Sequence, residues 1–306
     1  MKSSVAPIVL FAFNRPDHLK EVVHNLKLNE ISNKSSLHIF LDGPRSDSDF
    51  MKVNECLEYA KSISGFKELR INTSHKNLGL SRSIISGLNS IFQTYKSAII
   101  LEDDILVSKY FLEYMNNGLD TYHDSENVCS IHGYVYPHKI QLPETFFLRG
   151  ADCWGWASWA KNWKLFEPDG KKLLKNLMES GEIDKFDYFG RSGNVQMLKN
   201  QIEGVIDSWA IRWHASMFLA NKFTLYPNIS LVNNIGFDLS GTSSNKTKIF
   251  DTRINERPIR IELQKVEECV EARQVFNKFY LNRYSIIRNF CHQFRARLRR
   301  GRHENA

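Results

Sequence analysis

The chain has 306 residues, 42% of them hydrophobic and 12% aromatic, which predicts one large domain or two smaller ones and excludes a disordered polymer. Most of its formal net charge of +7 lies at the C-terminal end, because residues 283–306 hold seven arginines and one glutamate. The rest is nearly neutral, which excludes the broad basic face that binding to nucleic acid requires.

The N-terminal segment gives no sign of export. Residues 1–7 lack the charged and apolar regions of a signal peptide. No run in the chain reaches the ~18 apolar residues of a membrane-spanning helix. The five cysteines are scattered, without the spacing of metal ligands or of paired disulfides. We therefore expect a cytoplasmic protein in a reducing environment.

Short apolar runs alternate with helical patterns over the first third of the chain. This alternation predicts right-handed βαβ crossovers and a mostly parallel, Rossmann-like sheet flanked by helices, with a ligand crevice at the carboxyl ends of the strands. The predicted strands cover residues 7–13, 37–41, 68–72 and 97–101, and the predicted helices cover 18–28, 50–62, 80–95 and 109–122.

The strand at 97–101 ends in three consecutive acidic residues, Glu102, Asp103 and Asp104. Three carboxylates at the tip of a buried strand repel one another unless a cation joins them. Carboxylates with open coordination positions suit Mn²⁺ or Mg²⁺, which can bridge the oxygens of a diphosphate. The alternative is a solvated acidic turn that begins the next helix.

Two other strand ends carry polar residues. Asp42 follows the second strand, where its carboxylate could accept hydrogen bonds from a base or a ribose hydroxyl, or could serve only the Asp-Gly-Pro turn. Asn14 and Arg15 follow the first strand, where Arg15 could pair with a phosphate or lie in solvent. All these residues belong to the predicted ligand edge of the sheet.

The alternation weakens after residue 122 into short strands, aromatic clusters and loops. A helix is predicted at 207–219, a pair of strands at 223–226 and 230–233, and a loop or lid at 236–248, before a helical and basic remainder. Indole rings can stack on sugar rings, so Trp154, Trp156 and Trp209 are candidate substrate contacts, with core packing as the alternative.

Several of these segments together resemble a known family. They are PIVLFAFNRPDHL from Pro7, FLDGP from Phe40, NLGLSRS from Asn77, ILEDDI from Ile100, FLEYM from Phe111, WGWASW from Trp154 and IDSWAIRW from Ile206. The chain resembles bacterial sugar transferases with the GT-A fold, of the family 2-like group, which are related to the N-acetylglucosaminyltransferase that begins complex N-glycans. The resemblance covers roughly residues 7–241.

The resemblance implies roles for individual residues. Asp104 would be the metal ligand in a variant DxD motif that includes Glu102 and Asp103, and Asp42 would contact the nucleoside. Asp207 would be the base that deprotonates the acceptor hydroxyl, with inversion at the anomeric carbon; read from the residues alone, Asp207 could instead cap its helix. With Asn14 and Arg15, Arg82 completes the expected nucleotide contacts.

We expect a GT-A domain at residues 1–245, with a nucleotide-sugar half at 1–105 and an acceptor half at 106–245, and a helical, basic extension at 246–306. The expected activity is the transfer of a hexosyl or N-acetylhexosaminyl group from a nucleotide sugar, a UDP-sugar by resemblance, to a hydroxyl of a glycan or lipid-linked saccharide in polysaccharide biosynthesis. The alternatives are a metal-dependent nucleotidyltransferase and a non-catalytic module that binds glycan or membrane.

The last residues carry a further pattern. Apolar side chains fall on one helical face, with arginines beside it, which predicts a peripheral helix on the anionic inner surface of a membrane. A helix docked on the body, or a solvated basic tail, is the alternative. The apolar residues are Ile287, Phe290, Cys291, Phe294 and Leu298.

Overall fold

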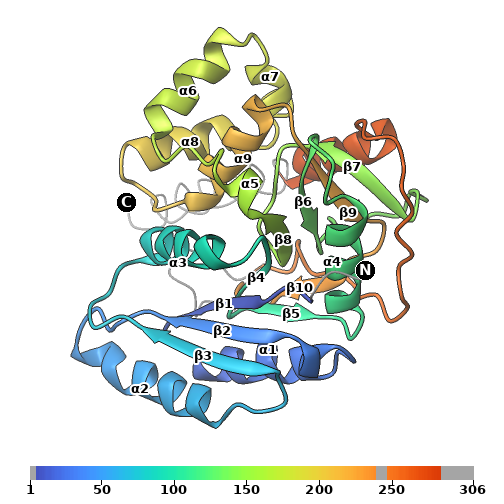
Figure 1. The fold of residues 1–306 in the computed structure, drawn as a ribbon. Coiled ribbons are helices and arrows are strands. Elements are labelled where there is room, and N and C mark those ends of the chain that lie inside the picture. The colour runs from blue at the N-terminus through green and yellow to red at the C-terminus, as the bar shows by residue number, and fades with distance from the viewer. Residues whose placement is uncertain (1–4, 239–246, 284–306) are drawn as a thin grey trace, which may run out of the picture.

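The computed structural model describes residues 5–238 and 247–283 (Figure 1). Its first third confirms the predicted alternation of strands and helices. The elements are β1 (Ile8–Ala12), α1 (Pro16–Lys27), the short 3-10 helix η1 (Ser32–Lys34), β2 (Ser36–Leu41), α2 (Asp47–Ser62), β3 (Glu68–Thr73), α3 (Leu80–Thr94) and β4 (Ser97–Glu102).

These four strands are parallel and lie in the order β3-β2-β1-β4, so their carboxyl ends meet at one edge. Every residue of β1 is buried, as expected for a central strand covered on both faces. Helices α1 and α2 cover one face and α3 covers the other (Figure 1). Alternate β1 residues pack on each side: Leu10 against Leu19 and Val23 of α1, and Val9 against Ile84 of α3.

The second part of the chain contains β5 (Ile105–Val107), α4 (Phe111–Thr121), β6 (Val128–His132), β7 (Thr145–Arg149), β8 (Trp156–Trp159), α5 (Ala160–Trp163), α6 (Gly170–Glu179), α7 (Ile183–Phe186), α8 (Asn194–Ile202), α9 (Trp209–Leu219), β9 (Phe223–Pro227) and β10 (Val232–Asn234). Strands β6 to β9 extend the sheet, whereas β5 and β10 form a separate two-stranded antiparallel sheet. The eight-stranded order is β3-β2-β1-β4-β8-β6-β9-β7, and β8 runs antiparallel to both of its neighbours. The result is a mixed α/β fold with a Rossmann-like half.

The two strands predicted at 223–226 and 230–233 are confirmed as β9 and β10; β9 pairs with β6 and β7, and β10 pairs with β5. The stretch before residue 204, predicted as short strands, aromatic clusters and loops, contains the short strands β6, β7 and β8 and also four helices that were not predicted, α5 to α8. Helices α6, α7 and α8 bury Leu177, Phe186 and Leu198 in a separate cluster with α9, so tertiary packing stabilises helices too short to form alone.

The C-terminal extension also differs from the expectation. Residues 247–269 form no helix, and a helix covers 270–283. This helix buries Val275, Phe276 and Tyr280 beside Phe146 and Tyr226 of the sheet, so it docks on the body. The residues of the predicted membrane helix, 287–298, and most of the predicted lid lie outside the described residues.

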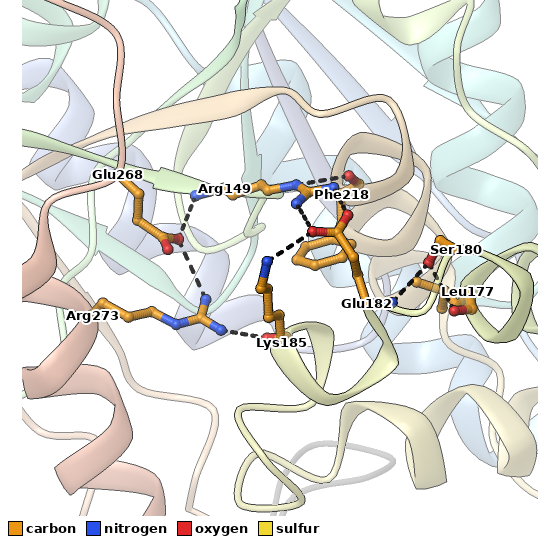
Figure 2. Close-up of polar contacts among 8 residues, drawn as sticks. All are labelled: Arg149, Leu177, Ser180, Glu182, Lys185, Phe218, Glu268 and Arg273. Carbon is orange, nitrogen blue, oxygen red and sulfur yellow. Dashed lines mark hydrogen bonds and ion pairs between the residues drawn. The ribbon is translucent and has the colours of Figure 1, made fainter.

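A network of charged side chains holds this extension in place (Figure 2). We name it the C-terminal clasp; it consists of Arg149, Glu182, Lys185, Glu268 and Arg273. Arg149 binds both oxygens of Glu182 at 2.9 and 2.7 Å, and its backbone N–H donates to Glu268, which pairs with Arg273 at 3.4 Å. The hydrogen bonds from Arg149 lower the pKa of Glu182 to about 2.

Among residues 5–238 and 247–283, none of the helices combines the length and the apolar character needed to cross a membrane.

Candidate functional site

The carboxyl edge of the parallel strands gathers most of the predicted site residues. Arg15 lies between β1 and α1 and reaches across to the end of β4. Its Nη1 pairs with Asp104 Oδ2 at 2.9 Å, and its Nη2 pairs with Asp103 Oδ1. The two strands are neighbours, with Phe11 opposite Glu102, which places the loops after them side by side. The guanidinium therefore joins two adjacent carboxylates.

The acidic cluster, Glu102, Asp103 and Asp104, carries more negative charge than this one cation compensates. Asp103 is 3% exposed, and its Oδ2 has no hydrogen-bond partner. Burial raises the pKa of Glu102 to about 8, and the charges of Asp104 and Asp103 add to the shift. Burial also raises the pKa of Asp103, against the opposing effect of Arg15. An unpartnered, buried carboxylate oxygen is costly unless a cation or donor reaches it.

The acidic cluster offers carboxylate oxygens as ligands for a divalent metal. In the described ranges, no three His, Cys, Asp or Glu side chains converge as a ready ligand set. The donor chemistry nevertheless suits a hard cation, since Asp104 and the unpartnered Oδ2 of Asp103 supply carboxylate oxygens. These two residues would hold the metal, beside the carboxyl group of Glu102.

A glycine of the segment after β10 lies against the cluster. A Cβ on Gly236 would come within 2.2 Å of Asp104 Oδ2, so only glycine allows this approach. The same segment is fixed by a hydrogen bond from the N–H of Ile235 to the carbonyl of Asp104, 2.9 Å long. The Asp104 carboxylate thus lies between the guanidinium of Arg15 and the backbone of Gly236.

Asp42, at the end of β2, is 6% exposed and fully engaged within the protein. Its Oδ1 accepts from the N–H groups of Gly43 (2.9 Å) and Leu78 (2.8 Å). Its Oδ2 accepts from the N–H of Gly79 (3.0 Å) and the amide of Asn77 (3.1 Å). A carboxylate has about four acceptor sites. In this structure Asp42 therefore orders the loop that leads into α3.

Asp207 is exposed and lies at the first turn of α3, where its Oδ2 accepts from the N–H of Ser81 at 3.2 Å. The sequence had left open that Asp207 caps its own helix, α9, and the structure shows that it does not. Ser208 is the N-cap of α9 and accepts from the N–H of Ile211 at 3.3 Å. Gly79 begins α3 with a φ of 78° and no side-chain cap, so Asp207 supplies the carboxylate that favours a helix N-terminus.

Arg212 fixes the relative position of α9 and α3. It is 8% exposed, and its guanidinium donates to the carbonyls of Ser208 (3.2 Å) and Pro168 (3.1 Å) and to the hydroxyl of Ser81. Burial lowers the pKa of Arg212, while the charge of Asp207 opposes that shift. Sequence reasoning did not identify this residue; its place as the seventh residue of the IDSWAIRW segment was the available signal.

The remaining predicted nucleotide contacts are less central. Asn14 donates to Asp49 of α2 at 2.5 Å, and Asp49 also binds Arg45, which lowers the pKa of the carboxyl to about 2. Arg82 is exposed on the first turn of α3. Neither contacts the acidic cluster through a hydrogen bond or ion pair in the described part of the chain.

The tryptophans divide into two groups. Trp156 and Trp209 are 0% and 2% exposed and pack on each other in the core, with ring centroids 5.8 Å apart. The prediction that they contact substrate is therefore wrong, because no ring face is open to a sugar. Trp154 is only half-buried, and its ring meets Tyr134 (4.8 Å) and Phe237 (5.6 Å) edge-on.

The segment just before Trp154 was missed by sequence reasoning. Burial, followed by the charges of Asp152, Glu102 and Asp104, raises the pKa of the Cys153 thiol, so this thiol lies within electrostatic range of the acidic cluster. The N–H of Trp154 donates to His132 Nε2 at 3.1 Å, and the opposite ring nitrogen donates to a carbonyl. Buried neutral His132 thus anchors this segment.

Comparisons with known proteins add little to this site. No protein-family model matches the chain, and no curated protein matches its sequence. Among solved structures, a nucleotide-diphospho-sugar transferase from Desulfovibrio desulfuricans is similar at 12% identity, over 55% of this chain and 69% of that one, with a TM-score of 0.33. A UDP-glucose pyrophosphorylase complexed with UDP-glucose is similar at 11% identity, over 53% and 79%, with a TM-score of 0.31. Such distant likenesses do not bear on activity.

Proposed function

We propose that the protein is a metal-dependent glycosyltransferase of the GT-A type. It transfers a sugar from a nucleotide-sugar donor, a UDP-sugar, to a hydroxyl of a glycan or lipid-linked saccharide. The observation that carries this proposal is the acidic cluster at the carboxyl end of β4, where three carboxylates face one guanidinium and Asp103 Oδ2 has no partner. Ligand sites in open parallel sheets form at this edge.

Asp104 and Asp103 would hold Mn²⁺ or Mg²⁺ at this cluster. When bound, such an ion neutralises the negative charge of a departing nucleoside diphosphate. Arg15, Asn14 and Arg82 follow the same edge of the sheet and contribute cations and an amide toward the nucleotide. Asp42 supports donor binding through the loop at residues 77–79, whose backbone it orders.

Asp207 is the proposed general base. Its Oδ2 accepts from the N–H of Ser81, while Oδ1 accepts no hydrogen bond from the described residues and the side chain is exposed. In the transfer, the acceptor oxygen forms a bond to the anomeric carbon while the bond from that carbon to the diphosphate breaks. The hydroxyl proton passes to Asp207, and attack from the face opposite the leaving group inverts the anomeric configuration.

The proposed setting is the cytoplasmic side of surface-polysaccharide assembly, where nucleotide sugars are donors. The test incubates the purified chain with a panel of nucleotide sugars and saccharide acceptors, with Mn²⁺ or with EDTA. We expect Mn²⁺-dependent release of a nucleoside diphosphate. Release of pyrophosphate from a nucleoside triphosphate and a sugar phosphate would instead identify a nucleotidyltransferase, and absence of any turnover would favour a binding module.

A further inference from the structure

We propose that Arg15 is the resident counter-ion of the acidic cluster and competes with the metal for it, so that Arg15 sets the metal affinity of the site. The inference rests on the proposed function in one respect, which is that the metal binds at Asp103 and Asp104. It assigns Arg15 a positioning role in the metal-free protein, separate from any contact with the donor.

The backbone holds Arg15 where its side chain must cross to β4. Arg15 is the N-cap of α1, with φ −118°, and its carbonyl accepts from the N–H of Leu19 at 3.0 Å. Pro16 at the first helical position disfavours the helical conformation for the residue before it, and Arg15 lies outside the helical region with a ψ of 73°. The backbone from which the Arg15 side chain extends is therefore fixed at the start of α1.

The guanidinium occupies one oxygen of each carboxylate that would hold the metal, Oδ1 of Asp103 and Oδ2 of Asp104. The side chains of Arg15, Asp103 and Asp104 are 16%, 4% and 15% exposed, so these ion pairs are shielded from solvent. Asp104 Oδ2, bound to Arg15 at 2.9 Å, also lies beside Gly236, where a Cβ on that residue would come within 2.2 Å of it. This oxygen therefore has little room for a metal while it holds Arg15.

No other cation replaces Arg15. Among the described residues, no other lysine, arginine or histidine forms an ion pair with Asp103 or Asp104. Removal of the guanidinium leaves three neighbouring carboxylates without a cation, which destabilises the metal-free fold. A divalent ion then restores the balance without first displacing an existing partner. The variant should thus lose stability without metal and gain affinity for metal.

The experiment measures Mn²⁺ binding by the electron paramagnetic resonance signal of the free ion, and thermal unfolding in EDTA and in Mn²⁺, without any nucleotide. Arg15→Gln removes the charge, and Arg15→Lys keeps a charge without the planar fork that joins two carboxylates. Arg45→Gln is the matched control, because Arg45 pairs with Asp49 at 2.7 Å and not with the cluster.

We expect the Kd for Mn²⁺ to fall about tenfold in Arg15→Gln, equivalent to about 1.4 kcal/mol, with Arg15→Lys between that value and wild type. The melting temperature of Arg15→Gln should fall in EDTA and recover in Mn²⁺ more than that of wild type. Arg45→Gln should keep the wild-type Kd.

If the wild type binds Mn²⁺ and the Arg15 variants bind it with the same or a higher Kd, this inference is overturned and the proposed metal site remains intact. If neither the wild type nor the variants bind Mn²⁺, both the metal site and the inference fail. Should Arg15→Gln not fold in EDTA, the comparison of Arg15→Lys with wild type still decides.

Discussion

Two groups of charged side chains in this molecule differ in their ratio of cations to carboxyl groups. In the acidic cluster, the single guanidinium of Arg15 pairs with two of the three carboxyl groups, and one buried oxygen has no partner. In the C-terminal clasp, three cations meet two carboxylates, and no side-chain atom of the clasp is buried without a partner in the part of the chain that the structure describes (Figure 2).

Under the proposed function, the difference separates a group of side chains that stabilises the fold from one that receives a ligand. In a network whose polar groups all have partners, the hydrogen bonds offset the cost of removing those groups from water. The hydrogen bonds of the clasp connect Arg149 of the sheet to Glu182 at the start of α7 and to Glu268, and connect Arg273 of the C-terminal helix to Lys185 of α7. An unsatisfied cluster costs free energy until a cation arrives. The same residue types therefore have different effects according to whether their buried polar atoms already have partners.

Asp104→Ala should have the largest effect on the cluster side of this comparison. Loss of the proposed metal ligand should reduce Mn²⁺-dependent donor turnover by on the order of 10²-fold or more, since the metal contributes several kcal/mol to charge stabilisation. Steady-state turnover and circular dichroism on one preparation check this. The clasp variant Glu182→Gln should retain turnover. Normal Mn²⁺-dependent turnover in a folded Asp104→Ala protein would refute the metal assignment.

Asp207→Asn should remove the base and keep the shape. Asparagine can still accept the hydrogen bond from the N–H of Ser81, so the fold should persist. Transfer should fall by ~10²- to 10⁴-fold, while donor and Mn²⁺ binding stay near wild type. The exposed Asp184→Asn variant is the control and should transfer normally. Equal rates in both variants would place the base elsewhere.

Arg149→Met should break the clasp and leave the cluster alone. The side chains of Arg149 and Glu182 are 16% and 30% exposed, so the loss should be about 1–3 kcal/mol in the free energy of unfolding. Urea denaturation measures this loss. Lys61→Met is the control, because the Lys61 pair with Glu58 is exposed and should contribute almost nothing. A change in Mn²⁺ affinity on Arg149→Met would contradict the separation of the two groups.

The two groups should also respond differently to pH. Because the folded pKa of Glu102 is raised from 4.5 to about 8, its contribution favours the fold below pH ~4.5 and is lost as pH rises toward about 8. Metal-free stability should therefore decline across this window, by at most ~5 kcal/mol for a pKa shift of this size. Glu102→Gln should flatten the decline, measured by urea denaturation in EDTA.

The clasp supplies the contrast for that measurement. The pKa of Glu182 is lowered to about 2, so this residue is ionised throughout the same window and its contribution is lost only in stronger acid. Glu182→Gln should therefore show the same slope with pH as wild type. A flat wild-type profile would show that Glu102 does not hold its proton in the folded protein.

The sequence predicted the first half of the fold because its central strands are buried on both faces. Strands β1 and β4 read as uninterrupted apolar runs, and the polar residues after them mark the ligand edge. Helices α6 to α8 were missed because α7 has four residues and α8 nine, and their stability comes from packing on α9.

The site was predicted in position and only partly in detail. Sequence order placed Asp42 and Asp104 at one edge, since parallel strands end there. It could not reveal that loop amides fill all the acceptor sites of Asp42, or that Arg15 binds Asp104, because side-chain partners depend on tertiary approach. Trp156 points into the core for the same reason: strand periodicity gives two faces, and both faces of β8 are covered.

The eight-stranded sheet has two edge strands, β3 and β7, and each is protected from pairing with another strand in a different way. At β3 the charged side chains of Glu68 and Arg70 stand on the outermost strand. At β7 the C-terminal segment runs alongside: Glu268 bridges to Phe147 in parallel fashion, and the N–H of Cys269 donates to the carbonyl of Phe147 at 2.9 Å. An uncovered strand edge is a template for pairing with a second molecule. A chain shortened before Glu268 would expose the edge of β7, and we expect it to associate with itself more readily than the full chain, as measured by light scattering.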